Sequence, residues 1–227
     1  MCDNTQSILF FDSFLCNIMV NNLTIRKEKN MQIVLSTGNP SKVEQIKPML
    51  AGSSISILTL EEAGIEDQAV EDGLTLQENA LKKAMFVHQK KPGVWAMADD
   101  TGIFINHLGG LPGVNTARWS GGNTDTDQIT QWILKQLESA TDRSATFKTV
   151  VALISPEGEQ YFFNGKVQGC ILQAPRTKAQ PKMPYSSIFV PEGTDKVLAE
   201  MTIEEENDVS HRGQAFRKAR AFLRTVR

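Results

Sequence analysis

The sequence predicts an α/β protein with a mixed sheet and flanking helices. Three observations lead to this prediction: a strand-helix-strand unit within residues 32–58, a long strand pair around Pro156-Glu157-Gly158, and amphipathic helices between and after the strands. A strand-helix-strand unit makes parallel neighbours, whereas a tight hairpin makes antiparallel ones. With 227 residues and 41% hydrophobic content, the chain is long enough for one large domain or two small lobes.

The first unit begins close to Met31. Residues 32–36 form a short apolar strand pattern, and Asn39 and Pro40 suit the cap and the first position of a helix. The helix carries an apolar stripe, and a second strand is expected at 55–58. This order predicts parallel pairing of the two strands.

The other elements follow along the chain. Thr75 and Glu78 have the spacing of a capping box, so we expect Glu78 to cap a helix that runs to about residue 89. The remaining expected elements are a strand at 94–98 with a continuation at 103–105, a helix from about 125, strands at 147–154 and 160–172, and a helix from about 213.

Residues 1–30 differ in character from the rest. Their apolar stretches are interrupted by Asp12 and Asn17 and have no basic residue before them, so they predict neither a secretory signal nor a membrane span. We interpret residues 1–30 as an N-terminal extension or the product of an upstream start codon. Residues 31–227 are then the functional domain.

Charge and cysteine content narrow the possible functions. The formal net charge of -2 offers no basic surface for nucleic acid. Cys2, Cys16 and Cys170 have no metal-ligand spacing and are odd in number, which indicates reduced thiols in a cytoplasmic protein.

The segment Thr37-Gly38-Asn39-Pro40-Ser41-Lys42 joins the first strand to its helix. Backbone N–H groups and the helix dipole attract anions at such a turn, and Lys42 adds a full positive charge. The pattern differs from the Gly-x-x-x-x-Gly-Lys-Ser/Thr loop of common NTPases. By itself it fits a phosphate site or an ordinary strand-to-helix turn.

A group of acidic residues stands near the third strand. Asp99 and Asp100 follow an apolar run, where adjacent carboxylates are costly without a partner, and alternation lets at most one face a given pocket. Glu71 precedes the second helix, on which Asn79 and Lys83 share a face. Carboxylates from separate segments suit Mg²⁺, although a purely structural role for the aspartates stays open.

Two further segments could contact anions. Ser210 can cap the last helix, which places the donors of His211 and Arg212 beside a helix N-terminus. Arg118 follows a glycine-rich turn. Both segments are also compatible with solvated residues at the surface.

Taken in order, these segments resemble the inosine triphosphatase family, also called HAM1-like. The resemblance covers most of residues 31–227. Its markers are Thr37–Lys42, Glu71 with Gly73-Leu74-Thr75, Glu78-Asn79-Ala80 with Lys83-Ala84, Ala98-Asp99-Asp100-Thr101-Gly102, Leu111–Arg118 and Ser210–Ala215.

The resemblance implies a homodimeric enzyme with two lobes around a central cleft. Such enzymes cleave nucleoside triphosphates such as ITP, dITP and XTP to the monophosphate and pyrophosphate. It further implies that Glu71 and Asp100 bind Mg²⁺ and that Asp100 accepts the proton of the attacking water. The implied substrate contacts are Thr37, Gly38, Asn39, Pro40, Ser41, Lys42, Thr101, Tyr185, Ser186, His211 and Arg212.

The base-recognition stretch departs from the family pattern. Where Gly-Phe-Gly-Tyr-Asp-Pro-Ile-Phe is usual, residues 182–189 read Lys-Met-Pro-Tyr-Ser-Ser-Ile-Phe, so Met183 and Ser186 replace the stacking aromatic and the base-reading aspartate. Glu206 stands in place of a lysine, and the loop before Phe189 is slightly longer, with added charge at Lys182. A hydroxyl donates or accepts, whereas a carboxylate only accepts. We therefore hypothesise that hydrolysis is retained but base preference is altered.

Two other functions stay open at this point. One is a Maf-like nucleotide pyrophosphatase with a different base preference, which the altered base loop allows. The other is a nucleotide-binding protein without catalysis, which the presence of Lys42, Glu71 and Asp100 disfavours.

Overall fold

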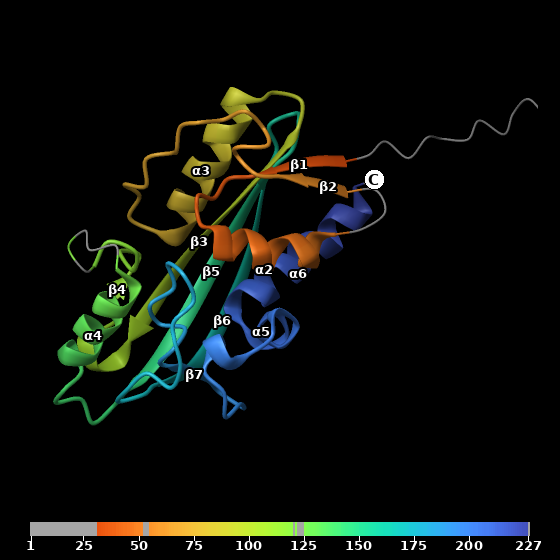
Figure 1. The fold of residues 1–227 in the computed structure, drawn as a ribbon. Helices are drawn as coiled ribbons and strands as arrows, with labels where there is room; N and C mark the ends of the chain where they lie inside the picture. Colours follow the sequence, from red (N-terminus) through yellow and green to blue (C-terminus); the bar gives the residue numbers. More distant parts are fainter. Residues whose placement is uncertain (1–30, 52–54, 120, 122–124, 227) are drawn as a thin grey trace, which may run out of the picture. The chain divides into compact units, whose positions relative to one another are not determined.

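The computed structural model describes residues 31–51, 55–119, 121 and 125–226. The predicted N-terminal extension, residues 1–30, therefore lies outside the described residues. In the described part of the chain, seven strands form one mixed sheet in the order β2-β1-β3-β5-β6-β7, with β4 paired to β3 (Figure 1). The strands are β1 Met31–Leu35, β2 Ile55–Leu58, β3 Trp95–Ile105, β4 Pro112–Gly113, β5 Ser144–Ile154, β6 Gln160–Ile171 and β7 Phe189–Pro191.

The strand pairing agrees with the predicted α/β class and mixed sheet. β1 pairs in parallel with β2 and β3, whereas β5 and β6 form the expected antiparallel hairpin, with Ile154 opposite Gln160. One expectation is wrong: Asp99 and Asp100 do not end a strand but lie inside β3, opposite Val151 and Val150 of β5. The backbone pairing with β5 continues from Ala96 to Ile105, so the strand needs no break at the acids.

The helices start where side chains cap them. The helices are α2 Pro40–Leu50, α3 Leu76–Lys90, α4 Thr126–Gln136, α5 Ile203–Val209 and α6 His211–Thr225, with 3-10 turns η1 Asn106–Leu108 and η2 Leu198–Glu200. Asn39 and Thr75 cap α2 and α3 as predicted, although the Glu78 carboxylate accepts from the backbone N–H of Leu74 rather than that of Thr75. Because Ser210 Oγ accepts from the Gly213 N–H, α6 starts at His211, two residues before the predicted start.

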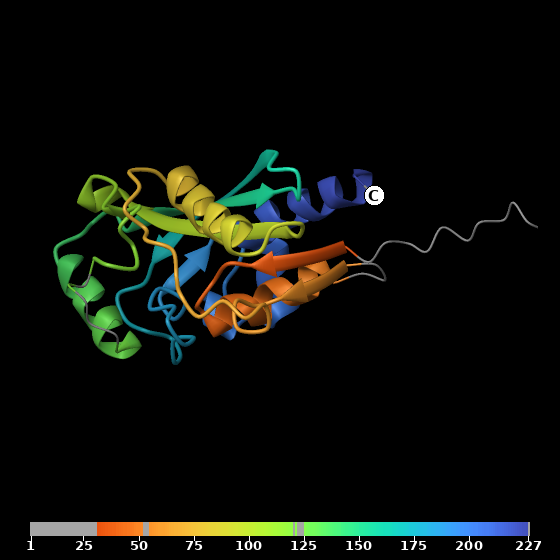
Figure 2. The ribbon, with the colours of Figure 1, turned by 90° about the horizontal axis from the view of Figure 1, so that it is seen from above.

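Helices cover both faces of the sheet. α3 packs over one face around Val34, Ala96 and Ala152, while α2 and α6 pack over the other around Ile33 and Met97. Figure 2 shows α3 and α2 on opposite sides of β1. A third apolar cluster gathers residues of α4 and β7 at the far end of the long strands, for example Ile133 and Phe189.

One close contact holds the start of α6 on the sheet. A Cβ atom at Gly165 of β6 would lie 1.9 Å from the carbonyl oxygen of His211 and 2.8 Å from the backbone nitrogen of Ala215. These distances are too short for any side chain, so the helix backbone rests directly on β6 at this glycine. The position of His211 thus depends on the absence of a side chain at residue 165.

Candidate active site

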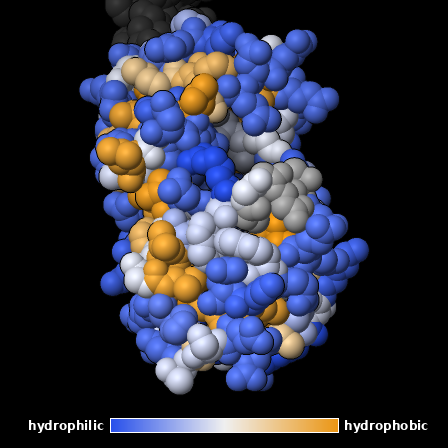
Figure 3. All heavy atoms as spheres, turned by 90° about the vertical axis from the view of Figure 1, so that its left-hand side faces the viewer, coloured by the Kyte–Doolittle hydropathy of each residue, from blue (hydrophilic) through white to orange (hydrophobic). Residues whose placement is uncertain are grey.

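A cavity opens beside the middle of β3. On that edge of β3, β1 pairs only as far as Met97 and β4 begins pairing at Ile103, so in the described part of the chain residues 98–102 have no strand beside them there. The cavity has a volume of about 420 Å³ and is lined by residues from both ends of the sheet. Figure 3 shows this side of the molecule hollowed between an upper and a lower part, with hydrophilic residues in the hollow.

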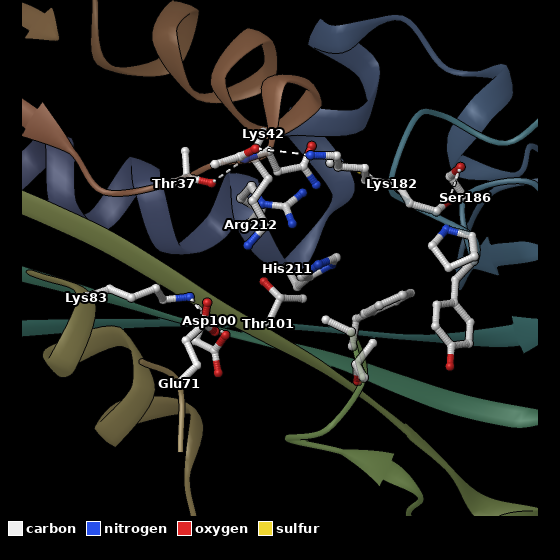
Figure 4. Close-up of a pocket in the computed structure, with 18 of the residues that line it drawn as sticks. Thr37, Lys42, Glu71, Lys83, Asp100, Thr101, Lys182, Ser186, His211 and Arg212 are labelled. Carbon is white, nitrogen blue, oxygen red and sulfur yellow. Dashed lines mark hydrogen bonds and ion pairs between the residues drawn. The ribbon is translucent and has the colours of Figure 1, made fainter. Parts of the chain in front are cut away.

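Two carboxylates and one lysine form a cluster on the α3 side of the cavity. Lys83 Nζ lies 3.1 Å from Glu71 Oε2 and 3.2 Å from Asp100 Oδ1. Burial disfavours the Lys83 ammonium, but Asp100, Asp99 and Glu71 outweigh this effect and raise the pKa of Lys83. Burial raises the pKa of Asp100, against the opposing effect of Lys83 and Lys42. The predicted set of Glu71, Lys83 and Asp100 is therefore brought together (Figure 4).

Asn79 supports this cluster without lining the cavity. It is 1% exposed, and its Oδ1 accepts a hydrogen bond from the Gly73 backbone N–H at 2.8 Å. A Cβ atom at Gly73 would lie 2.7 Å from that oxygen, so the turn after Glu71 needs a glycine here. Asn79 and Lys83, which share a face of α3 as predicted, thus hold the segment that carries Glu71 through their bonds to Gly73 and Glu71.

Asp99 points to the opposite face of β3 and has a different environment. Its Oδ2 lies 2.8 Å from Lys42 Nζ and 3.5 Å from Arg212 Nε, and its side chain is 0% exposed. The charges of Lys42 and Arg212 overcome the cost of burial and hold the pKa of Asp99 far below its usual range. Thr101 Oγ1 also donates to Asp99 at 3.2 Å. Asp99 thus orients two cations and does not line the cavity.

The predicted phosphate loop borders the cavity in part. Thr37, Gly38, Asn39 and Lys42 line it, whereas Pro40 and Ser41 belong to the helix start and do not. The Asn39 side chain accepts from the Ser41 N–H, which fixes the turn, and the Thr37 hydroxyl accepts from the Asn39 N–H at 3.2 Å. The loop therefore presents its turn and the N-terminus of α2 to the cavity, across from the acidic cluster (Figure 4).

The opposite end of the cavity is more apolar. Phe147 stacks on the His211 ring, with ring centres 4.5 Å apart and planes 7° from parallel. Both ring nitrogens of His211 are buried and find no hydrogen-bond partner among the described residues. Burial and the nearby Arg212 lower the pKa of His211 well below its usual value, so the ring is neutral. Tyr185 and Leu198 also line the cavity.

Ser186 lines this end, but its hydroxyl is already engaged. It accepts from the Gln180 N–H at 2.8 Å and donates to the Met183 carbonyl at 2.7 Å. Glu206, 3% exposed, accepts from the Gln180 side chain through Oε2 and has no partner for Oε1 among the described residues. Glu206 and the neutral His211 are thus freer than Ser186 to bond to a base.

Arg118 is not brought into the cavity. Its side chain is exposed and lies 3.4 Å from Asn115 Oδ1 within its own turn, while Thr116 and Ala117 of the same segment do line the cavity.

Several lining residues did not stand out in the sequence. Phe147, Thr126 and Gln68 come from an ordinary strand, helix and loop, and carry no local motif. Their positions depend on contacts between segments distant in the chain, such as the stacking of Phe147 on His211. For Lys182 one signal was present, because it adds charge to the lengthened loop.

The chain is similar to known proteins over most of its length. The model of the Ham1 family matches residues 33–222. A protein named dITP/XTP pyrophosphatase from Thermoanaerobacter pseudethanolicus is 40% identical over 195 residues, which are 85% of this chain and 96% of that protein. A protein of the same name from Porphyromonas gingivalis is 39% identical and is covered over 97% of its length.

Solved structures give the same result for the fold. A HAM1 protein from Coxiella burnetii matches with a TM-score of 0.75 and 33% identity, over 86% of this chain and 99% of that one. The Staphylococcus aureus Ham1 protein matches with a TM-score of 0.74 and 28% identity, over 86% of this chain and all of that one, 100%.

Proposed function

Because the chain belongs to the Ham1 family, we propose that it hydrolyses nucleoside triphosphates to the monophosphate and pyrophosphate. One observation carries the proposal: the carboxylates of Glu71 and Asp100 line the same cavity as the anion-attracting turn and Lys42. The relatives named dITP/XTP pyrophosphatase support inosine and xanthosine triphosphates as the substrate class. They also favour this function over a Maf-like pyrophosphatase or a binding protein without catalysis.

Glu71 and Asp100 are suitable to hold Mg²⁺. Magnesium in proteins is usually bound by one or two carboxylates together with water and substrate phosphates. The described residues contain no group of three or more His, Cys, Asp or Glu side chains that could hold a metal, but they do contain this pair. Asp100 Oδ2 is buried without a hydrogen-bond partner there, as expected for an oxygen awaiting a ligand. When bound, Mg²⁺ neutralises phosphate charge.

The chain's own groups would perform the other tasks. Asp100 orients a water and accepts its proton, since its carboxylate lines the cavity that would receive the phosphates. Lys83 positions both carboxylates by its contacts to Glu71 and Asp100. Lys42 and the amides of Thr37–Asn39 stabilise the phosphate oxygens at the start of α2.

Base choice is the second part of the proposal. The hydroxyl of Ser186 is bonded within its own loop, so His211 and Glu206 are the groups with free hydrogen-bonding capacity at the apolar end. The carboxylate of Glu206 accepts hydrogen bonds where the resembling pattern has a lysine that donates them. We therefore propose that preference for ITP and XTP is weakened or redirected.

Steady-state kinetics over ITP, dITP, XTP, ATP, GTP and the pyrimidine triphosphates tests both parts. Pyrophosphate release that requires Mg²⁺ supports the reaction. An ordinary strong preference for ITP and XTP would contradict the altered base choice, and the absence of release from every nucleotide would contradict the reaction itself.

Three further features belong to this proposal. We propose that residues 31–227 form the catalytic domain, that the enzyme acts in the cytoplasm, and that it is a homodimer. The described helices include none that is long and apolar enough to cross a membrane. Light scattering during gel filtration measures the subunit number directly, and a single subunit mass would overturn the dimer.

A further inference from the structure

Lys182 is unusual in its backbone conformation. Its φ is 57°, and it is the one non-glycine residue with positive φ in the part of the chain that the structure describes. Residues other than glycine rarely adopt this left-handed backbone conformation. The pattern that the loop resembles has glycine at this position, so the lysine is present despite an unfavourable backbone.

The loop that carries Lys182 lines the cavity and contacts the phosphate turn. The Ser41 hydroxyl donates to the carbonyl of Pro181 at 3.0 Å, and Lys182 Nζ donates to the carbonyl of Gly38 at 3.4 Å. The backbone N–H of Lys182 donates to Thr126 Oγ1, which ties the same residue to α4. Lys182 is thus tied to α4 through its backbone, while its side chain extends toward the turn that carries Thr37 and Lys42 (Figure 4).

The Lys182 ammonium has no carboxylate partner among the described residues. Its hydrogen bond to the neutral carbonyl of Gly38 is long, at 3.4 Å, whereas Lys42, which lines the same cavity, is already paired with Asp99. Lys182 lines the cavity and is exposed to solvent, so it can exchange the carbonyl for a charged group. An anionic oxygen is a stronger partner for an ammonium than a peptide carbonyl.

We propose that Lys182 is a phosphate clamp, a substrate-binding residue that leaves Gly38 and pairs with the triphosphate when a nucleotide enters the cavity. The charge of Lys42 is partly neutralised by Asp99, and Lys182 adds a second positive charge from the base-side loop. The clamp acts on the phosphates and is indifferent to the base. This inference rests on the proposed function for its substrate class.

The test uses variants that separate charge from backbone conformation. Lys182→Asn removes the charge but tolerates the left-handed region, Lys182→Gly removes the charge and the strain, and Lys182→Arg keeps the charge. A single ion pair at about 4 Å in water corresponds to about fivefold in affinity. We expect Lys182→Asn and Lys182→Gly to raise KM for dITP about fivefold or more, with kcat little changed and Lys182→Arg close to wild type.

Two readouts distinguish a charge effect from a loop effect. The difference between Lys182→Asn and wild type should shrink as salt concentration rises, because partly exposed charges are screened. The matched control is Lys178→Asn, which removes the same charge from the same loop outside the cavity lining and should leave KM unchanged. A wild-type KM in Lys182→Asn, or an equal rise in Lys178→Asn, would overturn the clamp.

Calorimetric binding of inorganic tripolyphosphate keeps this inference separate from the proposed reaction. If no nucleotide is hydrolysed but tripolyphosphate binding still weakens in Lys182→Asn and not in Lys178→Asn, the reaction is wrong and the clamp is right. If nucleotides are hydrolysed and both variants bind tripolyphosphate as wild type does, the clamp is wrong and the reaction is right.

Discussion

The neighbouring residues Asp99 and Asp100 should respond in opposite ways to the same substitution. Alternation along β3 directs Asp100 to Lys83 and into the cavity, whereas Asp99 is buried behind the cavity-lining cations Lys42 and Arg212. Replacement of each aspartate by asparagine changes little in shape and removes one negative charge. The position of that charge then decides whether catalysis or stability is lost.

Asp100→Asn should abolish turnover with little effect on stability. Loss of a general base lowers rates by about 10²–10⁴. Burial raises the pKa of Asp100, which means that the folded state disfavours its ionised form, so a neutral amide relieves an unfavourable charge. Glu71 remains as a partner for Lys83, and we expect the free energy of unfolding to stay within about 1 kcal/mol of wild type.

Asp99→Asn should instead destabilise the fold. Its carboxylate is fully buried and is the partner of two cations, Lys42 and Arg212, which are 16% and 5% exposed in their side chains. Removal of one partner from a buried ion pair costs about 3–5 kcal/mol because a buried charge is left unpaired. The amide keeps a hydrogen bond to Lys42, so we expect a loss near the lower limit of about 3 kcal/mol.

The assay combines pyrophosphate release with urea unfolding of each variant. Unfolding is measured in EDTA, so that metal binding does not contribute to the stability of any variant. The reasoning is refuted if Asp100→Asn retains activity within about tenfold of wild type, since a loss of a general base is larger. It is also refuted if Asp99→Asn unfolds at the same urea concentration as wild type.

Three other predictions concern stability and base choice. Folding keeps His211 neutral, whereas in the unfolded chain this histidine binds a proton below its usual pKa of about 6.5. The free energy of unfolding should therefore fall as the pH drops through about 6.5. In urea titrations from pH 5 to 8, His211→Gln should flatten this dependence. Gly165→Ala should destabilise by about 1–3 kcal/mol because α6 must move off β6, and thermal unfolding with an unchanged midpoint would contradict that contact. Glu206→Lys should raise the ratio of kcat/KM for ITP to that for GTP, measured with both nucleotides in one assay. The reason is that a hydrogen-bond donor would replace the Glu206 carboxylate, which now accepts from the Gln180 side chain. An unchanged ratio would show that Glu206 does not take part in base selection.

Local chemistry was the part of the fold that the sequence predicted well. The caps Asn39, Thr75 and Ser210 bond to backbone within three residues, so short patterns contain the whole interaction. Likewise, alternation along an extended chain predicted that only one of Asp99 and Asp100 would face the cavity. Which one faces it depends on the register of β3 against β5, with Asp100 opposite Val150, and no local pattern contains that information.

The base end of the cavity was least predictable, since it depends on the shape of one loop. Ser186 was expected to meet the base, but its hydroxyl bonds to Gln180 and Met183 as soon as the loop folds back on itself. The chain folds back in part through the left-handed backbone at Lys182, and a lysine gives no local signal for such a conformation. The partner of Phe147 also comes from a segment far along the chain.

The altered base loop and the geometry of the phosphate side have a common physical explanation. The acidic cluster and Lys42 are positioned by the interior of the sheet, by α2 and by α3, where a change leaves a buried charge unpaired. The loop at 180–186 satisfies its own polar groups through Gln180 and Ser186, so substitutions there leave few buried groups without partners. A chain built this way can accept changes in its base loop, including the charge at Lys182, without disturbing the groups that we propose to cleave the phosphoanhydride.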